Sequence, residues 1–275
     1  MANYYGNGGN NTINGSINDD FIYGKGGNDL LYGSFGNDFI NGGKGDDFLF
    51  GGDGDDILAG GKGDDTMEGG LGADQFKGGK GIDTADYSSA TSGVTVYFVN
   101  NTALGYAAGD TFVKMDNLIG TAFADYLQAG DDGMAVGGAG NDNLYGASYT
   151  TGDAAGVIRG DAGFDTLHMN YGDTTAWVQF GQGYDTIESF TENADMLMID
   201  LSEFGLGGSL DANELVNSNT ITAVGGNAQF IYEGDAGRLW FDQNGSGAGG
   251  LTLISEFVAS SIIAGTLDVG DFELV

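Results

Sequence analysis

The stretch from Gly42 to Glu68 reads GGKGDDFLF, GGDGDDILA and GGKGDDTME, three nonapeptides that follow one another without a gap. Each nonapeptide has glycine at places 1, 2 and 4, aspartate at place 6 and an apolar residue at place 8. Glycine permits tight, left-handed turns, and a fixed nine-residue period is typical of solenoid folds. The stretch therefore predicts a glycine loop and a short strand that alternate along the chain.

The same period covers residues 6–86, where glycine recurs at place 1 of nine successive rows. Place 6 of these rows is occupied by Asn11, Asp20, Asp29, Asp38, Asp47, Asp56, Asp65, Asp74 and Asp83. Place 8 is occupied by Ile13, Ile22, Leu31, Ile40, Leu49, Leu58, Met67, Phe76 and Ala85. Places 1, 6 and 8 thus keep their residue types over nine rows, and this repeat is the strongest signal in the sequence.

Composition narrows the possible partners of the chain. Its 275 residues carry a formal net charge of -32, from 40 acidic and 8 basic side chains. Such a chain repels phosphate backbones, so we expect no nucleic-acid binding, and its compaction needs counter-charges such as multivalent cations. It has no cysteine. No apolar run approaches the roughly 20 residues that span a membrane, and Met1–Asn10 shows no cleavable export signal, so we expect no membrane insertion.

The rest of the chain divides into three further segments. Residues 87–118 break the period and include the strand-like run Val94–Val99, which we expect to form a β spacer. Residues 119–190 form a second, interrupted block with an insertion at 146–159. Its place 6 is occupied by Asp125, Asp142, Asp165 and Asp185. We therefore expect domains at 1–86, 87–118 and 119–190, followed by a C-terminal cap with strand-like runs at 191–275.

The chain resembles the repeat and C-terminal region of RTX proteins, which Gram-negative bacteria export by type I secretion. The nonapeptide carries the resemblance, together with Gly93-Val-Thr-Val, Asp116-Asn-Leu-Ile-Gly-Thr and a closing segment at 181–204. Leu239–Gly247 and the tail Asp271–Val275 look like the serralysin-type C-terminal portion with its uncleaved secretion signal. The resemblance implies an all-β fold, a parallel β-roll in two blocks, and calcium-driven folding outside the cell.

In such a roll two nonapeptides make one turn, so residues that are 18 apart stack on each other. Asp29, Asp47, Asp65 and Asp83 would then form one column, and Asp20, Asp38, Asp56 and Asp74 the other. Side chains alternate along a strand, so place 8 should point inward and places 7 and 9 outward. Left-handed glycines would turn their carbonyl oxygens into the gaps between stacked loops.

Carbonyl and carboxylate oxygens form the hard, flexible donor set that calcium prefers, whereas magnesium demands a small octahedron. The six stacked Asp pairs in residues 20–83 therefore predict about six calcium ions, with a further site at Asn11–Asp29. The carbonyl ligands would come from Gly27, Gly36, Gly43, Gly45, Gly52, Gly54, Gly61, Gly63, Gly70 and Gly72. The alternative is that these aspartates and glycines only form turns. Asp242, Asn244 and Ser246 have the spacing of a short calcium loop or of a plain hairpin.

Motifs for catalysis are missing from the sequence. His168 is the one histidine, so a His-Glu-x-x-His zinc site cannot form, and there is no Gly-x-Ser-x-Gly elbow. The repeats begin at residue 6 and leave no room before them for the catalytic domain that the resemblance would place there. We therefore expect that the chain is not an enzyme and that His168, at place 9, lies on the surface.

Places 7 and 9 should face solvent, yet many of them are large and apolar. Phe21, Tyr23, Phe39 and Ile57 would lie on one face of the roll, and Leu30, Tyr32, Phe48 and Phe50 on the other. Exposed apolar stripes of this kind mark interfaces, here with other subunits, unless segments of the same chain cover them. Lys44, Lys62 and Lys80 share place 3 and would screen the acidic loops or meet an acidic partner.

These expectations favour a secreted, calcium-binding structural protein that self-assembles or adheres at the cell surface or in the extracellular matrix. One alternative is a calcium-dependent export and folding module of an exoenzyme, and another is a carbohydrate-binding module with a surface glycan as partner. Assembly predicts calcium-dependent filaments, surface layers or oligomers, the export module predicts a folded monomer, and the glycan binder predicts retention on polysaccharide.

Overall fold

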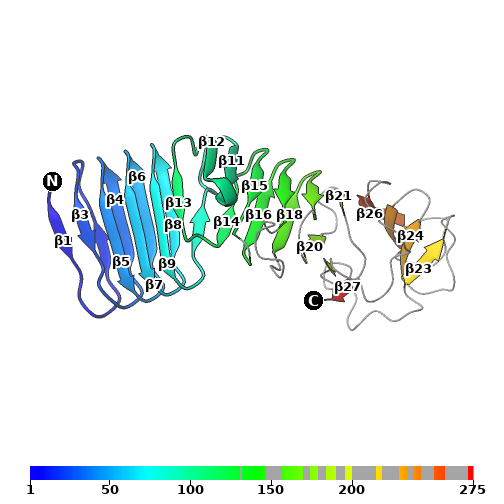
Figure 1. Ribbon diagram of the computed structural model, residues 1–275, viewed down its shortest axis with the longest axis horizontal. Helices are drawn as coiled ribbons and strands as arrows, with labels where there is room; N and C mark the ends of the chain where they lie inside the picture. Colours follow the sequence, from blue (N-terminus) through cyan, green and yellow to red (C-terminus); the bar gives the residue numbers. More distant parts are fainter. Residues whose placement is uncertain are drawn as a thin grey trace.

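The structure is a computed structural model that describes residues 1–130, 132–146, 156–169, 174–178, 184–189, 196–199, 215–218, 229–233, 238–242, 251–257 and 272–274. The described chain is an elongated β-solenoid in which nearly all strand pairs are parallel (Figure 1). The expected all-β parallel roll is therefore confirmed.

Three sheets build the solenoid. Sheet A has the order β1 (Asn3–Tyr5), β3 (Phe21–Tyr23), β5 (Phe39–Lys44), β7 (Ile57–Lys62), β9 (Gln75–Lys80) and β13 (Thr111–Val113). Sheet B has the order β2 (Thr12–Asn14), β4 (Leu30–Phe35), β6 (Phe48–Asp53), β8 (Thr66–Leu71), β10 (Thr84–Asp86), β14 (Asn117–Ile119), β16 (Met134–Ala139), β18 (Val157–Ala162), β20 (Thr175–Val178), β22 (Met196–Ile199) and β27 (Phe272–Leu274). Sheet C has the order β12 (Thr102–Gly105), β11 (Val94–Tyr97), β15 (Tyr126–Gln128), β17 (Asn143–Tyr145), β19 (Thr166–His168), β21 (Asp185–Glu188), β26 (Leu251–Phe257), β25 (Arg238–Asp242), β24 (Gln229–Glu233) and β23 (Leu215–Ser218).

The strand register follows the nonapeptide period. Ile40 pairs with Leu58 between β5 and β7, and Leu49 pairs with Met67 between β6 and β8. Each of these partners lies 18 residues from the other, so two nonapeptides make one turn, as expected. Within residues 1–86, successive rows therefore alternate between sheets A and B, and each loop crosses from one sheet to the other.

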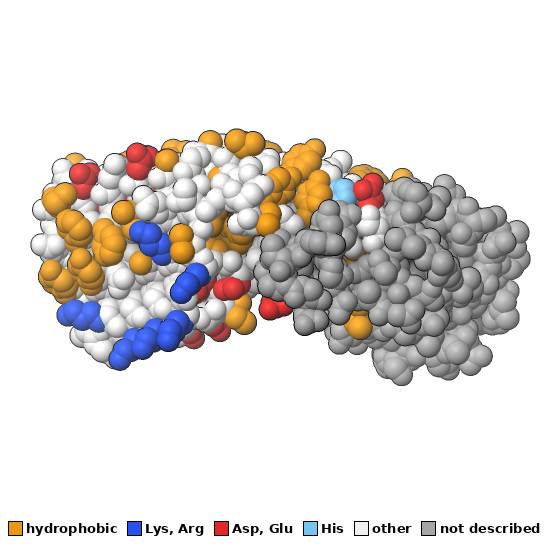
Figure 2. Space-filling view, in the orientation of Figure 1, with side chains coloured by type: hydrophobic (Ala, Val, Ile, Leu, Met, Phe, Trp, Pro, Cys, Tyr) orange, Lys and Arg blue, Asp and Glu red, His pale blue; other side chains and the backbone are white. Residues whose placement is uncertain are grey.

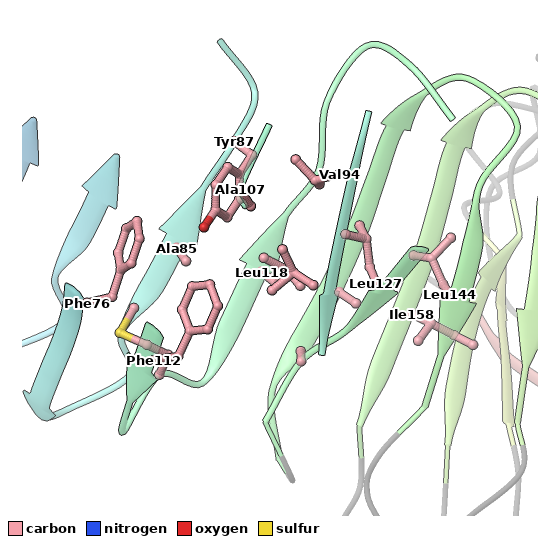
Figure 3. Close-up of a cluster of buried hydrophobic side chains, with 14 of the residues drawn as sticks. Phe76, Ala85, Tyr87, Val94, Ala107, Phe112, Leu118, Leu127, Leu144 and Ile158 are labelled. Carbon is pink, nitrogen blue, oxygen red and sulfur yellow. The ribbon is translucent and has the colours of Figure 1, made fainter. Parts of the chain in front are cut away.

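The core consists of the place 8 side chains between the two sheets. Ile22, Leu31, Ile40, Leu49, Leu58, Met67, Phe76 and Ala85 are completely buried. Figure 3 shows how this core continues into the second block, where Leu118, Leu127 and Leu144 follow Phe76 and Phe112. One apolar residue from each half-turn is thus sufficient for a continuous core, because the stacked rows shield one another.

The spacer joins the two blocks without interrupting sheet B. β10 pairs in parallel with β14, so sheet B runs on through residues 84–119. Sheet A ends at β13, whereas the antiparallel pair β11–β12 begins sheet C. The predicted strand Val94–Val99 is shorter than expected, because a 3-10 turn at Phe98–Asn100 ends it after Tyr97. Asn101 follows with a left-handed backbone and accepts the N–H of Phe112 at 2.6 Å.

The C-terminal segment contains strands, as its strand-like runs predict. β22 lies within the segment 189–204, and β24 and β25 coincide with the runs 228–232 and 238–241. β24, β25 and β26 pair in antiparallel fashion at the far end of sheet C. In the described part of the chain, no helix is long and apolar enough to cross a membrane. The division into four domains stays a prediction.

Candidate functional site

The loops between the strands share one backbone shape. In the nonapeptides from residue 42 to residue 83, the glycines at places 2 and 4 all have positive φ, for example 113° at Gly43 and 110° at Gly45. A side chain on Gly61 would overlap the carbonyl oxygen of Gly43 in the loop one turn earlier, and one on Gly63 would overlap that of Gly45. The place 2 and place 4 carbonyls therefore face the gap between stacked loops, as the sequence predicts.

The place 6 aspartates form two buried columns. From Asp38 to Asp83, Oδ1 of each aspartate accepts the backbone N–H of the aspartate one turn earlier, for example from Asp38 N–H to Asp56 at 2.7 Å and from Asp47 N–H to Asp65 at 2.9 Å. The second block repeats this ladder, since the N–H of Asp142 donates to Asp165 Oδ1 at 2.8 Å. From Asp20 to Asp83, each column aspartate is at most 2% exposed.

The second carboxylate oxygen is what sets these aspartates apart. Oδ2 is buried and has no hydrogen-bond donor in eight of them, namely Asp29, Asp38, Asp47, Asp56, Asp65, Asp74, Asp142 and Asp165. A buried oxygen without a partner costs roughly 1–3 kcal/mol, and more when it is charged. A cation between the loops would remove this cost, so the donor set fits calcium.

Each loop contributes one column carboxylate and several carbonyls. Among the described residues, no group of three or more His, Cys, Asp or Glu side chains could hold a metal by itself. Backbone carbonyls must therefore complete the coordination of any bound ion. A cation with six to eight oxygen ligands and flexible geometry, such as calcium, suits this arrangement better than magnesium does.

The electrostatics of the metal-free columns are unfavourable. Burial, together with the charge of neighbouring aspartates, raises the pKa to about 6 for Asp38, Asp47 and Asp83. The same causes raise the pKa of Asp56, Asp65 and Asp74 to about 7. In the second block burial raises the pKa of Asp142 and Asp185 to about 8. Hydrogen bonds from backbone N–H groups lower these values only in part.

Two rows satisfy their aspartate without an ion. In the row that begins at Gly15, Asp20 Oδ2 accepts the N–H of Ser16 at 2.8 Å and its hydroxyl at 2.7 Å. In the row that begins at Gly120, Asp125 Oδ2 accepts the N–H of Thr121 at 2.6 Å. In both rows the hydroxyl also accepts the place 4 N–H, from Asn18 at 3.2 Å and from Phe123 at 2.9 Å. We call these two the self-capped rows.

The place 4 residue separates self-capped rows from the others. Ser34 occupies the same place 2 as Ser16, but it has φ of 87° and leaves Asp38 Oδ2 without a partner. Place 4 is Gly36 in that row, with φ of 104°, whereas it is Asn18 in the self-capped row and has no positive φ. Hydrogen bonds from Ser16 and Ala2 outweigh the burial of Asp20 and lower its pKa.

Two ladder residues lie outside the nonapeptide pattern. The N–H of Asp74 donates to Asp110 Oδ1 at 2.8 Å, and the N–H of Asp83 donates to Asp116 Oδ2 at 2.8 Å. Asp110 Oδ2 accepts a hydrogen bond from the Tyr87 hydroxyl at 2.7 Å. The last carboxylate of this column therefore has a donor from the protein itself. Asp110 follows Asp74 by two full turns of the roll, so the period of the repeat would have identified it. Asp116 does not fit this period relative to Asp83.

Place 5 forms a further ladder that the sequence reasoning missed. The N–H of Asp46 donates to Asn28 Oδ1 at 3.1 Å, and the N–H of Asp64 donates to Asp46 Oδ1 at 3.0 Å. These bonds run in the opposite direction to those of place 6, and their side chains are exposed. The signal was present as Asn or Asp at place 5 of seven rows, from Asn10 to Asp64.

The other predicted site residues have varied surroundings. The Asn11 side chain is used locally, because it accepts the N–H of Asn7 and donates to the Gly9 carbonyl, both at 2.7 Å. Asp185 accepts the N–H of Asp165 at 3.2 Å. Asp242 ends β25, whereas Asn244 and Ser246 lie outside the described residues. His168 lies at place 9 but is largely covered, since it stacks on Tyr145 and approaches Glu188 at 2.9 Å.

A family description agrees with this geometry. The RTX calcium-binding nonapeptide repeat (4 copies) matches residues 5–40, 23–58, 32–67, 50–85 and 135–148. By its fold the described chain is a β-roll, and its loops are similar to a calcium-binding repeat. Residues 5–85 and 135–148, about a third of the chain, carry the match to the RTX nonapeptide. No curated protein matches the chain.

Proposed function

We propose that the chain is a secreted structural protein that folds on calcium outside the cell and then assembles or adheres at the cell surface or in the extracellular matrix. The stack of buried carboxylates that lack a donor for Oδ2 carries this proposal. In a chain of net charge -32, such columns repel one another until cations enter. Calcium is scarce in the cytosol, so the chain would stay unfolded there for type I export from a Gram-negative cell.

Calcium in this proposal lies between stacked loops that are left-handed at both places 2 and 4. The loops that begin at 24, 33, 42, 51, 60, 69 and 78 meet this condition and enclose about five gaps. The loops that begin at 137 and 160 enclose one more, between Asp142 and Asp165. Asp29, Asp38, Asp47, Asp56, Asp65, Asp74, Asp83, Asp142 and Asp165 would bind the ions with the place 2 and place 4 carbonyls.

Calcium counts should distinguish these loops from the self-capped rows. We expect Asp20→Asn to leave the number of bound calcium ions unchanged, because Ser16 already satisfies Asp20 Oδ2. Asp56→Asn should lower the number by one or two, since its loop borders two of the proposed gaps and its Oδ2 has no donor. Calcium bound per chain, measured by atomic emission after gel filtration, checks both variants. Equal losses in the two variants would contradict the assignment.

The outer faces of the N-terminal roll support self-assembly. Phe21, Tyr23, Phe39 and Ile57 lie on the outer side of sheet A, and Leu30, Tyr32, Phe48 and Phe50 on that of sheet B. Phe48 is 50% exposed and the other seven are partly exposed, so no described segment covers them fully. The rings stack along the roll, with 4.8 Å between the centroids of Tyr32 and Phe50. Figure 2 shows hydrophobic side chains gathered on one face of this roll.

A calcium titration tests the proposal. Purified chain is titrated from calcium-free buffer to 10 mM calcium, and each sample is measured by circular dichroism, light scattering and electron microscopy. We expect a coil-to-β transition in the range of about 10⁻⁴–10⁻³ M that is typical of extracellular calcium modules, followed by regular polymers. The same transition with monodisperse particles only would instead favour an export and folding module. Magnesium at the same concentrations is the control and should not fold the chain.

A further inference from the structure

The loops of the N-terminal roll form two opposite edges of different composition. Loops that lead from sheet A to sheet B form the first, here called the lysine edge: 24–29, 42–47, 60–65 and 78–83. Loops that lead from sheet B to sheet A form the second, here called the acidic edge: 15–20, 33–38, 51–56 and 69–74. Place 3 is exposed in seven of these eight loops, the exception being the buried Gly26. The exposed place 3 residue is a lysine on the first edge and an acidic or apolar residue on the second.

The lysine edge carries an unpaired row of positive charge. Lys44 pairs in register with Lys62, and Lys62 with Lys80, so their backbone positions repeat about every 4.8 Å along the roll. Like charges in register repel one another. Within the described residues, no carboxylate oxygen lies within 4.0 Å of these three ammonium groups. Such a row is stabilised by an anionic partner with the same spacing.

The acidic edge is the complement of the lysine edge. Its place 3 residues are Ile17, Phe35, Asp53 and Leu71, and Phe35, Asp53 and Leu71 pair in register. Ile17, Phe35 and Leu71 are 77%, 53% and 52% exposed. Asp19 and Asp55 are exposed at place 5, and the four loops contain no Lys or Arg. In the view of Figure 2, Lys side chains gather along the lower edge with some acidic side chains beside them, whereas the upper edge shows acidic and hydrophobic side chains and no blue ones.

We propose that the lysine edge of one copy of this chain docks on the acidic edge of the next copy. Both edges repeat with the rise of the same roll, so one translation can match every lysine with a loop of the neighbour. The lysine stems can cover Phe35 and Leu71 while their charges meet Asp53 and its neighbours. Two different surfaces meet in this contact, so it does not close on itself and builds an open row of rolls. The inference rests on the proposed self-assembly and adds the two loop edges to the outer sheet faces as contact surfaces.

A pair of charge-altered chains tests this contact. The first variant carries Lys44→Glu, Lys62→Glu and Lys80→Glu, and the second carries Phe35→Lys, Asp53→Lys and Leu71→Lys. Lysine occurs naturally at the same place of the opposite edge, so the roll accommodates it there. In calcium, each variant alone should lose the edge contact and scatter much less light than wild type, because its two edges now carry the same sign. An equimolar mixture should assemble again, because every Glu edge finds a Lys edge.

Circular dichroism keeps the test separate from folding, since both variants should show the wild-type calcium-induced β spectrum. Lys62→Glu should weaken assembly at least tenfold more than Lys77→Glu, which makes the same charge change on the outer face of sheet A. If wild type assembles and both triple variants still do so alone, the edge contact is wrong although self-assembly stands. If wild type stays monomeric in calcium, the proposed assembly fails, and the edge contact with it. Lysine-dependent binding to an anionic polysaccharide, without lysine-dependent assembly, would also overturn the contact.

Discussion

Calcium-free chain is expected to be unfolded at pH 8 and to regain much of its β-roll at pH 5. The six column carboxyls from Asp38 to Asp83 are buried, and their pKa in the metal-free fold is raised to about 6–7 by burial and by neighbouring charges. The unfolded chain has carboxyl pKa values near 3.9. At pH values between the unfolded pKa and the folded pKa, the folded state therefore binds more protons than the unfolded state does.

The direction of the pH effect follows from this difference. When folding takes up protons, the free energy of unfolding falls as the pH rises. The contribution of each carboxyl is fully present below its unfolded pKa and is lost as the pH rises through its folded pKa. A pKa raised from 3.8 to about 6, as for Asp38, corresponds to roughly 3 kcal/mol. Several such groups together are comparable with the roughly 5–15 kcal/mol that stabilises a domain.

Circular dichroism of calcium-free chain between pH 4.5 and 8.5, with thermal melts at each pH where the β-roll is present, measures this effect. With 10 mM calcium the trend should reverse, because the ion binds only deprotonated carboxylates and its binding releases protons. Asp56→Asn supplies the control, since a neutral amide removes one titrating group and should flatten the calcium-free profile. A calcium-free melting temperature that rises with pH would contradict the assignment of these buried carboxyls.

Much of the fold could be predicted because one residue type stands at each place of the repeat. Place 8 fixes the core, and a period of two nonapeptides per turn fixes the register, for example Leu49 against Met67. The replacement of sheet A by sheet C was not predictable, because it depends on where β11 and β13 pair in space. No local pattern in residues 87–118 records that choice.

The candidate site could be predicted at the level of its aspartates but not of their second oxygens. Asp20 and Asp38 look alike in sequence, and each follows a serine at place 2, Ser16 or Ser34. They differ because Asn18 and Gly36 at place 4 prefer different backbone conformations, which decides whether the serine donates to the carboxylate. A pattern that weighs place 4 together with place 2 would have identified the self-capped rows.

Gly61→Ala is expected to destabilise the calcium-bound roll by about 3 kcal/mol or more. Gly61 has φ of 115°, outside the regions that alanine favours, and its added methyl group would overlap the carbonyl oxygen of Gly43. Left-handed backbone alone costs a residue with a side chain roughly 1–2 kcal/mol. The collision adds to this cost, because the obstacle is backbone held in the ladder of the preceding turn. It also moves a carbonyl that would coordinate calcium, so the calcium midpoint should rise.

Gly26→Ala is the matched control in a loop of the same edge. Gly26 has no positive φ, and its nearest obstacle is the Lys44 carbonyl oxygen at 3.7 Å, so the melting temperature and the calcium midpoint should stay close to wild type. Within residues 6–86, side chains do occur at left-handed place 2 positions, at Lys25 and Ser34. In the loop one turn before Lys25 or Ser34, place 2 is occupied by Asn7 or Ser16. Neither of these residues has positive φ, and neither is part of the carbonyl stack. If Gly61→Ala melted like Gly26→Ala, the place 2 carbonyls would not be packed between the loops, and the proposed coordination by these carbonyls would be wrong.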